Sequence, residues 1–286
     1  PTRRSSDLID CAKIYQNEKE VGDALQELFK EGVVKREDLY ITTKLWNTDH
    51  DPAVVFQECQ KSLERLQVGH LDLYLIHWPV AHKHPENSEF SEFAHFFPKN
   101  EEGGCHQSNI PLIDTWHKME ELVEAGITKS IGISNFSVEQ TEEIVAKAKK
   151  VKPVTNQVEI HPSLPQTELA AACKKHGIVL TAYCPLAIGM NKSDTGLHEN
   201  EEIKAIADSA DGVETGAELV LRWNLQQGNI VLSKSTTPSR IAANAKTQVG
   251  SLGEKTLARL AEFGDKNPAR VCNPTFFNEK EAPFFA

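Results

Sequence analysis

Residues 130–183 have the sequence SIGISNFSVEQTEEIVAKAKKVKPVTNQVEIHPSLPQTELAAACKKHGIVLTAY. Three short apolar runs in this stretch, at 130–134, 155–160 and 178–183, have the length of buried strands. The segments between them, 138–150 and 166–176, have apolar residues at helical spacing. Strands that alternate with helices form parallel βα units, in which the helices cover the sheet. The stretch therefore predicts an α/β fold.

The same alternation extends over most of the chain. Further strands are predicted at 8–10, 39–45, 71–76 and 229–233, and further helices at 20–31, 52–66, 113–125, 199–210, 215–227 and 238–246. Proline marks two predicted helix starts, at Asp51-Pro52 and Thr237-Pro238, and Gly126 and Gly177 follow predicted helix ends.

Seven strands with helices between them fit either a closed (β/α)₈ TIM barrel or an open, doubly wound sheet. An open nucleotide-binding sheet is expected to have a G-x-G-x-x-G cluster after its first strand, and the sequence contains no such cluster. The even spacing of the units favours the barrel, with one βα unit unaccounted for.

We expect the missing βα unit to belong at the start of the chain. Residues 1–8 (PTRRSSDL) are polar and basic, and their order is similar to the translation of a common sequencing-adapter oligonucleotide. We expect residues 1–8 to be a non-native or divergent tail and 9–286 to form a single barrel domain. This domain would lack the amino-terminal hairpin and the first βα unit.

Composition limits the classes of partner. The chain of 286 residues is 40% hydrophobic and 25% charged, with a formal net charge of −10, which is typical of a soluble globular protein. The negative charge argues against a nucleic-acid partner, and no apolar stretch reaches the length of a membrane span. The six cysteines contain no C-x-x-C pair, so we expect reduced thiols in a cytoplasmic protein.

Reactive groups of a barrel lie at the carboxyl ends of its strands and in the loops that follow. The predicted strand ends carry Asp10, Lys44 and His77, and Tyr15 stands five residues after Asp10. A lysine ammonium favours the phenolate and lowers the pKa of a tyrosine, and a carboxylate can hold that lysine in place. A histidine can orient a carbonyl oxygen or share its proton. Each of these residues alone is more often structural, but together they form a set suited to proton donation.

These residues lie in motifs by which the chain resembles the aldo-keto reductase superfamily, from residue 9 to about 285. The motifs are 10–18 (DCAKIYQNE), 21–22 (VG), 42–46 (TTKLW), 71–79 (LDLYLIHWP), 132–136 (GISNF), 156–159 (NQVE) and 161–162 (HP). The resemblance implies a (β/α)₈ barrel and NADPH as hydride donor. It also implies that Tyr15 is the proton donor and that Asp10, Lys44 and His77 are the other catalytic residues. Family members with a similarly long loop after the His77 strand include the aldose, aldehyde and xylose reductases.

The resemblance also implies a cofactor site. Ser134, Asn135 and Gln157 match residues that hold the nicotinamide carboxamide, Tyr183 matches the ring that stacks on the nicotinamide, and Leu186 falls in the same site. The segment that binds the 2′-phosphate and the adenine is matched by Lys234, Ser235, Thr236, Arg240 and Asn244. Positive charge and the amino end of the helix after Pro238 agree with such a role. Two residues depart from the family pattern, Cys184 in place of a serine and Ala243 in place of a glutamate.

The predicted function is NADPH-dependent reduction of aldehydes or ketones, including open-chain sugars, to alcohols. His77 in place of a carboxylate favours carbonyl reduction over the reduction of a carbon–carbon double bond. Trp46, Trp78 and the aromatic tail at 270–286 predict an apolar-walled pocket for a small carbonyl substrate. The alternatives are a non-catalytic NADPH-binding barrel or an inactive fragment. We expect a monomer. We expect no metal site, because His82, His84, His95 and His106 are irregularly spaced.

Overall fold

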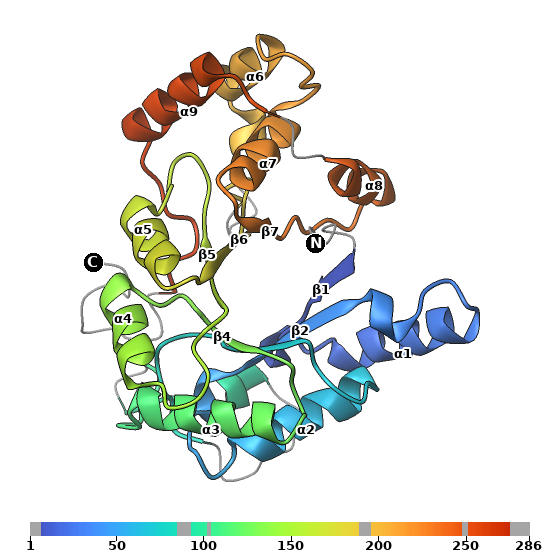
Figure 1. The fold of residues 1–286 in the computed structure, drawn as a ribbon, viewed down its shortest axis with the longest axis vertical. Coiled ribbons are helices and arrows are strands. Elements are labelled where there is room, and N and C mark those ends of the chain that lie inside the picture. The colour runs from blue at the N-terminus through green and yellow to red at the C-terminus, as the bar shows by residue number, and fades with distance from the viewer. Residues whose placement is uncertain (1–6, 85–92, 102–103, 189–195, 248–250, 275–286) are drawn as a thin grey trace. The chain divides into compact units, whose positions relative to one another are not determined.

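The computed structural model describes residues 7–84, 93–101, 104–188, 196–247 and 251–274. The chain divides into two compact units, one of residues 1–156 with 274–286 and one of residues 157–273. Each unit contains parallel strands followed by helices (Figure 1).

The first unit is built on four strands that neighbour one another in chain order, β1 (Leu8–Asp10), β2 (Tyr40–Leu45), β3 (Leu73–Ile76) and β4 (Ile131–Ser134). All three pairings are parallel, and Asp10 pairs with Thr42, Leu45 with Ile76, and Ile76 with Ile133. Because the strands are parallel and in this register, their carboxyl ends meet at one edge of the sheet.

Helices connect these strands. They are α1 (Glu18–Lys30), α2 (Val55–Leu66), α3 (Leu112–Glu124) and α4 (Val138–Lys147), with short 3₁₀ helices η2 (Lys13–Tyr15), η3 (Arg36–Asp38), η4 (Asn47–Asp49) and η5 (Phe93–Phe96). Helices α1 and α2 approach closely at Gly22, where an added Cβ would lie 2.4 Å from the carbonyl oxygen of Arg65. Only glycine allows this contact between the two backbones.

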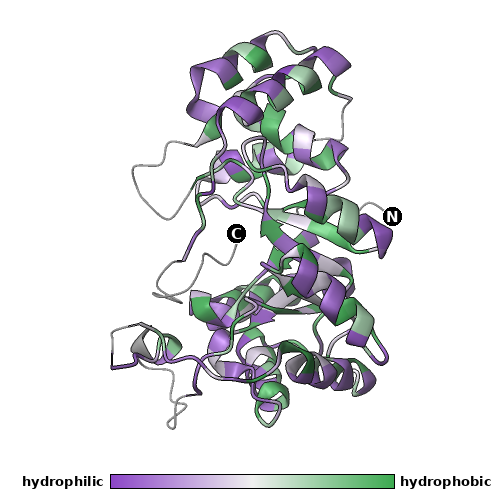
Figure 2. Ribbon diagram, turned by 90° about the vertical axis from the view of Figure 1, so that its left-hand side faces the viewer, coloured by the Kyte–Doolittle hydropathy of each residue, from purple (hydrophilic) through white to green (hydrophobic). Residues whose placement is uncertain are grey.

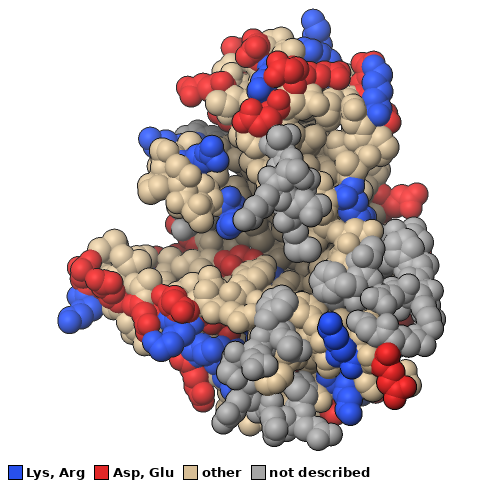
Figure 3. All heavy atoms as spheres, turned by 180° about the vertical axis from the view of Figure 1, so that it is seen from behind, with Lys and Arg blue, Asp and Glu red and all other residues tan. Residues whose placement is uncertain are grey.

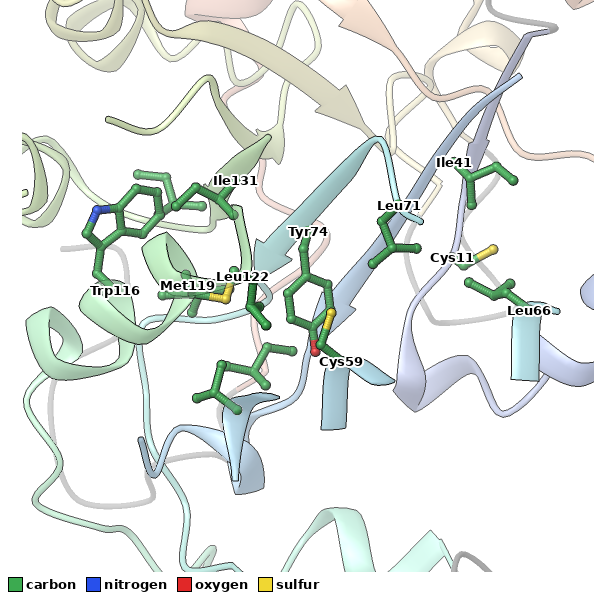
Figure 4. Close-up of a cluster of buried hydrophobic side chains, with 14 of the residues drawn as sticks. Cys11, Ile41, Cys59, Leu66, Leu71, Tyr74, Trp116, Met119, Leu122 and Ile131 are labelled. Carbon is green, nitrogen blue, oxygen red and sulfur yellow. The ribbon is translucent and has the colours of Figure 1, made fainter. Parts of the chain in front are cut away.

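One hydrophobic core fills the space between these helices and the sheet (Figure 4). Helix α3 supplies Trp116, Met119 and Leu122, which pack with Tyr74 of β3 and Ile131 of β4 in this cluster, each at most 1% exposed. Burial of a large apolar side chain contributes about 1.5–3 kcal/mol. The core therefore fixes the strands whose ends carry the candidate site.

The second unit holds the end of β5 (Thr155–Glu159), then β6 (Val179–Tyr183) and β7 (Ile230–Val231). Strands β6 and β7 are parallel, with Thr181 paired to Ile230 and Ala182 to Val231. The helices of this unit are α5 (Thr167–Lys175), η6 (Leu197–Glu199), α6 (Glu201–Asp208), α7 (Gly216–Gln226), α8 (Pro238–Lys246) and α9 (Glu254–Lys266).

Most predicted elements are confirmed within a few residues at their ends, and α8 has the predicted bounds. The predicted helix start at Asp51-Pro52 is wrong. The side chain of Asp51 accepts a hydrogen bond from the Ala53 amide (2.9 Å) in a turn, and α2 begins at Val55. Helix α9 was not predicted.

Hydrophilic and hydrophobic residues alternate along the helices (Figure 2), which is typical of helices that cover a sheet on one side. On the face shown in Figure 3, acidic and basic side chains lie beside one another rather than in separate patches. In the described ranges of the chain, no helix has both the length and the apolar composition that crossing a bilayer requires.

Candidate active site

The carboxyl edge of the first unit's sheet brings four predicted residues together. Asp10 is the last residue of β1, Lys44 is in β2, and His77 directly follows β3. Tyr15 ends η2, the short helix after β1. The four come from three neighbouring strands and one turn, as predicted.

Lys44 is the centre of this group. Its side chain is fully buried, and its Nζ donates to Asp10 Oδ2 (2.5 Å), the Cys11 carbonyl oxygen (2.9 Å) and Tyr15 Oη (3.5 Å). Burial opposes the charge, but the Asp10 carboxylate holds the pKa of Lys44 above its usual value. Lys44 is therefore a fixed positive charge beside the phenol of Tyr15.

Tyr15 is the exposed member of the group, with 49% of the residue accessible to solvent. The protein packed around the hydroxyl raises the pKa of Tyr15 above 10, while Lys44 lowers it and Asp10 raises it. The predicted lowering by Lys44 is thus present but does not decide the net direction. The phenol stays protonated at neutral pH, which is the state that a proton donor needs.

His77 lies on another side of Tyr15, with 6.1 Å between the ring centroids and an angle of 88° between the planes. Burial, with a smaller contribution from Lys44, holds the pKa of His77 well below 6.5. The imidazole is therefore neutral at physiological pH. Among the described residues, its Nδ1 has no hydrogen-bond partner.

The two predicted substrate tryptophans both contact His77. Trp46 packs edge-on against the imidazole with ring centroids 5.2 Å apart, and Trp78 stacks on it at 6.3 Å. The Trp46 indole donates to the carbonyl oxygen of Phe96 in η5 (2.9 Å), and its ring also contacts Phe97 (5.6 Å). Aromatic rings therefore line this part of the edge.

The predicted carboxamide-binding residues of the first unit follow β4. Asn135 has a left-handed backbone (φ 64°), and its side-chain amide donates to the His77 carbonyl oxygen (2.9 Å) and to Ser134 Oγ (3.1 Å). Both residues are buried. Asn135 thus ties the end of β4 to the residue that carries the imidazole.

The other predicted cofactor residues lie in the second unit. Gln157 is buried in β5, Tyr183 ends β6, and Leu186 is half-buried beyond it. Burial and the neighbouring Cys272 thiol raise the pKa of Tyr183 well above 10.

The predicted phosphate segment of that unit leads into α8. Lys234 and Arg240 are exposed, and neither forms an ion pair with an acidic side chain in the part of the chain that the structure describes. Ser235 Oγ accepts a hydrogen bond from the Thr237 amide (3.1 Å), Pro238 is the first residue of α8, and Thr236 and Asn244 lie in the same segment. None of the α8 residues is buried.

The comparisons with known proteins agree with this geometry. The model of the aldo/keto reductase family matches residues 3–265. The chain belongs to the aldo-keto reductase family. The chain therefore has the (β/α)₈ fold of this family. The parallel strands and connecting helices of each unit are parts of that fold.

This aldo-keto reductase is similar to several named relatives. It is 41% identical over 269 residues to aldose reductase B of Dictyostelium discoideum, covering 94% of this chain and 83% of that one. It is 42% identical to a glycerol 2-dehydrogenase (NADP(+)) of Hypocrea jecorina, covering 82% and 73%. The solved structure of an aldose reductase from Giardia lamblia matches with a TM-score of 0.88 and 36% identity, covering 98% of this chain and 90% of that chain.

Sequence reasoning missed a second group of charged residues beside the reductase site. Lys13, two residues before Tyr15, is buried and donates to Asp49 (2.5 Å) and Glu58 (2.7 Å). Its position between apolar neighbours in the motif Cys-Ala-Lys-Ile-Tyr is the signal that could have identified it, because a lysine buried in such a place needs a carboxylate partner. Its two partners are 36 and 45 residues away in sequence.

The predicted substrate cover includes the aromatic tail and the long segment after β3. The aromatic tail residues Phe276, Phe277, Phe284 and Phe285 lie outside the described residues. Before them, the amides of Val271 and Cys272 donate to the buried Glu159 carboxylate, both at 2.8 Å. In the long segment 80–109, His84 Nδ1 contacts the Thr48 carbonyl oxygen (2.9 Å) and Asp49 (3.4 Å).

Proposed function

We propose that this aldo-keto reductase reduces aldehydes or ketones to alcohols with NADPH, and that Tyr15 is the proton donor. The observation that carries the proposal is the chain of contacts from Asp10 through Lys44 to the Tyr15 hydroxyl, at 2.5 and 3.5 Å. A protonated phenol beside a fixed ammonium can release its proton to an oxygen on which negative charge develops.

Each residue has a distinct part in the proposal. Tyr15 donates its proton to the carbonyl oxygen, and Lys44 stabilises the phenolate that remains. Asp10 keeps Lys44 charged and in place. The neutral imidazole of His77, beside Tyr15, can orient the carbonyl oxygen by a hydrogen bond. NADPH, when bound, supplies the hydride for the carbonyl carbon.

The residues of each unit fit this cofactor. In the second unit, Lys234 and Arg240 are exposed cations at the start of α8 without an acidic partner among the described residues. A 2′-phosphate is a dianion that such a pair would bind, with the Ser235 and Thr236 hydroxyls as further donors. Gln157 and Tyr183 would hold the nicotinamide there, and Ser134 and Asn135 of the first unit are the further candidates for its carboxamide.

A small carbonyl compound with a polar or aromatic body is the proposed substrate. Trp46 and Trp78 both contact His77 and are 3% and 6% exposed, and we propose that their rings form the apolar wall of the pocket for a sugar or an aromatic ring. The names of the relatives support this class, because they include aldose reductases and a glycerol dehydrogenase. We propose reduction of open-chain sugars and related aldehydes.

A monomer in a reducing compartment is proposed together with this activity. All six cysteines are free thiols. Cys11 is buried, and burial raises its pKa to about 12. The thiol therefore stays protonated at neutral pH, and the reactive thiolate does not form.

The test is Tyr15→Phe, which removes the proton but keeps the ring. We expect kcat for an aldehyde such as nitrobenzaldehyde to fall by about 10²-fold or more, while NADPH binding measured by fluorescence is retained. The control is Tyr40→Phe, which removes a hydroxyl that contacts Ser130 Oγ (3.2 Å) and should leave kcat unchanged. Wild-type kcat in Tyr15→Phe would overturn the assignment of the acid, and a wild-type chain that binds NADPH without turnover would indicate a non-catalytic barrel.

A further inference from the structure

The short helix η2 carries Tyr15 but has few local contacts that could fix it. It has three residues, no side chain caps it, and Gln16 leaves it in a left-handed conformation (φ 55°). Its backbone hydrogen bonds are Tyr15 N to the Ala12 carbonyl oxygen (2.9 Å) and Gln16 N to that of Lys13 (3.2 Å). The Tyr15 ring is half-exposed, so its own burial does not hold it either.

Lys13 is the residue of η2 that is buried, at 7% exposure. Its Nζ lies 2.5 Å from Asp49 Oδ2 in η4 and 2.7 Å from Glu58 Oε2 in α2. Both carboxylates are at most 1% exposed. Because a 3₁₀ helix has three residues per turn, side chains two positions apart leave it on different sides. Lys13 is therefore directed into the protein while Tyr15 faces Lys44.

The two carboxylates are themselves fixed by further contacts. Thr48 Oγ1 donates to Asp49 Oδ1 (3.0 Å), and His84 approaches the same oxygen at 3.4 Å. Lys61 Nζ lies 2.7 Å from Glu58 Oε1. Two acidic groups are thus matched by the two lysines, and each acid belongs to an element that follows β2. The cluster Lys13–Asp49–Glu58 ties η2 to those elements.

A buried ion cluster of this kind is a poor source of net stability, because removing three charges from water costs about as much as their attraction returns. The cluster instead fixes the positions of its side chains, since moving any one charge away from its buried partner is energetically costly. The Lys44–Tyr15 contact needs such precision, because its 3.5 Å separation is already at the outer limit of a hydrogen bond.

We propose that Lys13 is a positioning residue for the reductase reaction, holding η2 through Asp49 and Glu58 so that the Tyr15 hydroxyl stays within reach of Lys44. The proposal rests on the proposed function of Tyr15 as the acid. Lys13 does not contact the reacting atoms. Its loss acts on the proton-transfer step and leaves cofactor binding, which uses other residues, unchanged.

The experiment compares kcat, KM and NADPH binding in variants of the full chain. Lys13→Met removes the charge at similar length, and the triple variant Lys13→Met/Asp49→Asn/Glu58→Gln removes all three charges so that no buried acid is left unpaired. In both variants we expect kcat to fall roughly tenfold to a hundredfold, since small misplacements of a catalytic group have effects of that size. KM and NADPH affinity should stay within about twofold of wild type, a difference near the scatter of such measurements.

Two milder variants keep the test decisive if a drastic one does not fold. Lys13→Arg preserves the charge and should restore most of kcat. Glu58→Gln leaves Lys13 paired with Asp49 and should give an intermediate kcat. The matched control is Lys129→Met, which removes an ion pair with Asp72 (2.8 Å) elsewhere in the same unit and should leave kcat unchanged.

The outcomes separate this inference from the proposed function. Folded cluster variants with wild-type kcat, beside an inactive Tyr15→Phe, would overturn the positioning role and leave the acid assignment intact. Wild-type kcat in Tyr15→Phe itself would overturn the proposed function first. A parallel loss of kcat and of NADPH affinity in the cluster variants would indicate a general structural role and would also overturn the proposal.

Discussion

Two regions of this reductase use positive charge in opposite ways. At the sheet edge of the first unit, the Lys44 side chain is fully buried and bound to Asp10 and to the Cys11 carbonyl oxygen. At the start of α8 in the second unit, Lys234 and Arg240 are exposed and have no acidic partner within the described ranges.

The difference shows which charges are available to a ligand. Lys44 is held by groups of the protein, so its charge acts on groups inside the site, among them the Tyr15 hydroxyl. Lys234 and Arg240 have no acidic partner among the described residues, so their charge is available to an anion from solution.

Removal of the buried charge at Lys44 should have the largest effect. In Lys44→Met, no ammonium stabilises the phenolate, and we expect kcat to fall by about 10²- to 10⁴-fold with NADPH binding retained. Steady-state kinetics and a fluorescence titration measure the two effects. Lys19→Met, which removes an exposed surface pair with Asp23, is the control and should retain wild-type kcat. A decrease in kcat of less than tenfold in Lys44→Met would contradict the role given to Lys44.

The exposed charge should have a smaller effect, and a selective one. Arg240→Ala removes a charge-assisted contact with the 2′-phosphate worth about 1.5–3 kcal/mol, or roughly tenfold to a hundredfold in NADPH affinity. NADH lacks that phosphate and should bind as before. Titration of both cofactors measures the ratio. The control is Arg259→Ala, because Arg259 of α9 donates to Ser209 Oγ at the end of α6 (2.6 Å), away from α8 in sequence. Equal losses for NADPH and NADH would assign Arg240 to the fold instead.

The smallest effect concerns pH and stability in the first region. His50 is fully buried, and burial lowers its pKa to about 3, against 6.5 in the unfolded chain. The folded protein therefore lacks a proton that the unfolded chain takes up below pH 6.5. The contribution of His50 to stability is complete above pH 6.5 and is lost as pH falls toward 3, by about 1.4 kcal/mol per pH unit at most.

Denaturant unfolding of wild type and of His50→Gln between pH 7 and 4.5 checks this expectation. The variant should lose less stability on acidification, although buried His77 and His82 contribute in the same direction. Identical slopes for the two proteins would show that His50 does not titrate on unfolding.

The fold was largely predictable, because local patterns determine its elements. The strand ends that carry Asp10, Lys44 and His77 follow apolar runs, and Pro238 begins α8 as predicted. Helix α9 was missed because it follows Gly253 and no side chain caps its start. The helix start predicted at Asp51-Pro52 was wrong because an aspartate followed by a proline is typical both of a turn and of a helix start.

Only those residues of the candidate site that lie in the family motifs could be predicted from the sequence. The Asp10, Tyr15, Lys44 and His77 group is brought together by the parallel register, which strand order implies. The Lys13 cluster could not be predicted, because Asp49 and Glu58 are distant from Lys13 in sequence and no local pattern indicates that they pair. Whether the pKa of Tyr15 is raised or lowered also depends on the packing around its hydroxyl, which the spacing of residues in the sequence does not predict.

Helix α8 has a consequence for how tightly a cofactor is held. It has nine residues, none of them buried, and Ile241 is 50% exposed. Helices shorter than about 12–15 residues are marginal in water without packing, so the amides of α8 should exchange with solvent deuterium early, through local opening. A ligand at this helix must then select its ordered form, and the measured dissociation constant equals the intrinsic one divided by the ordered fraction. The helical propensity of α8, and not only its charges, thereby sets the affinity.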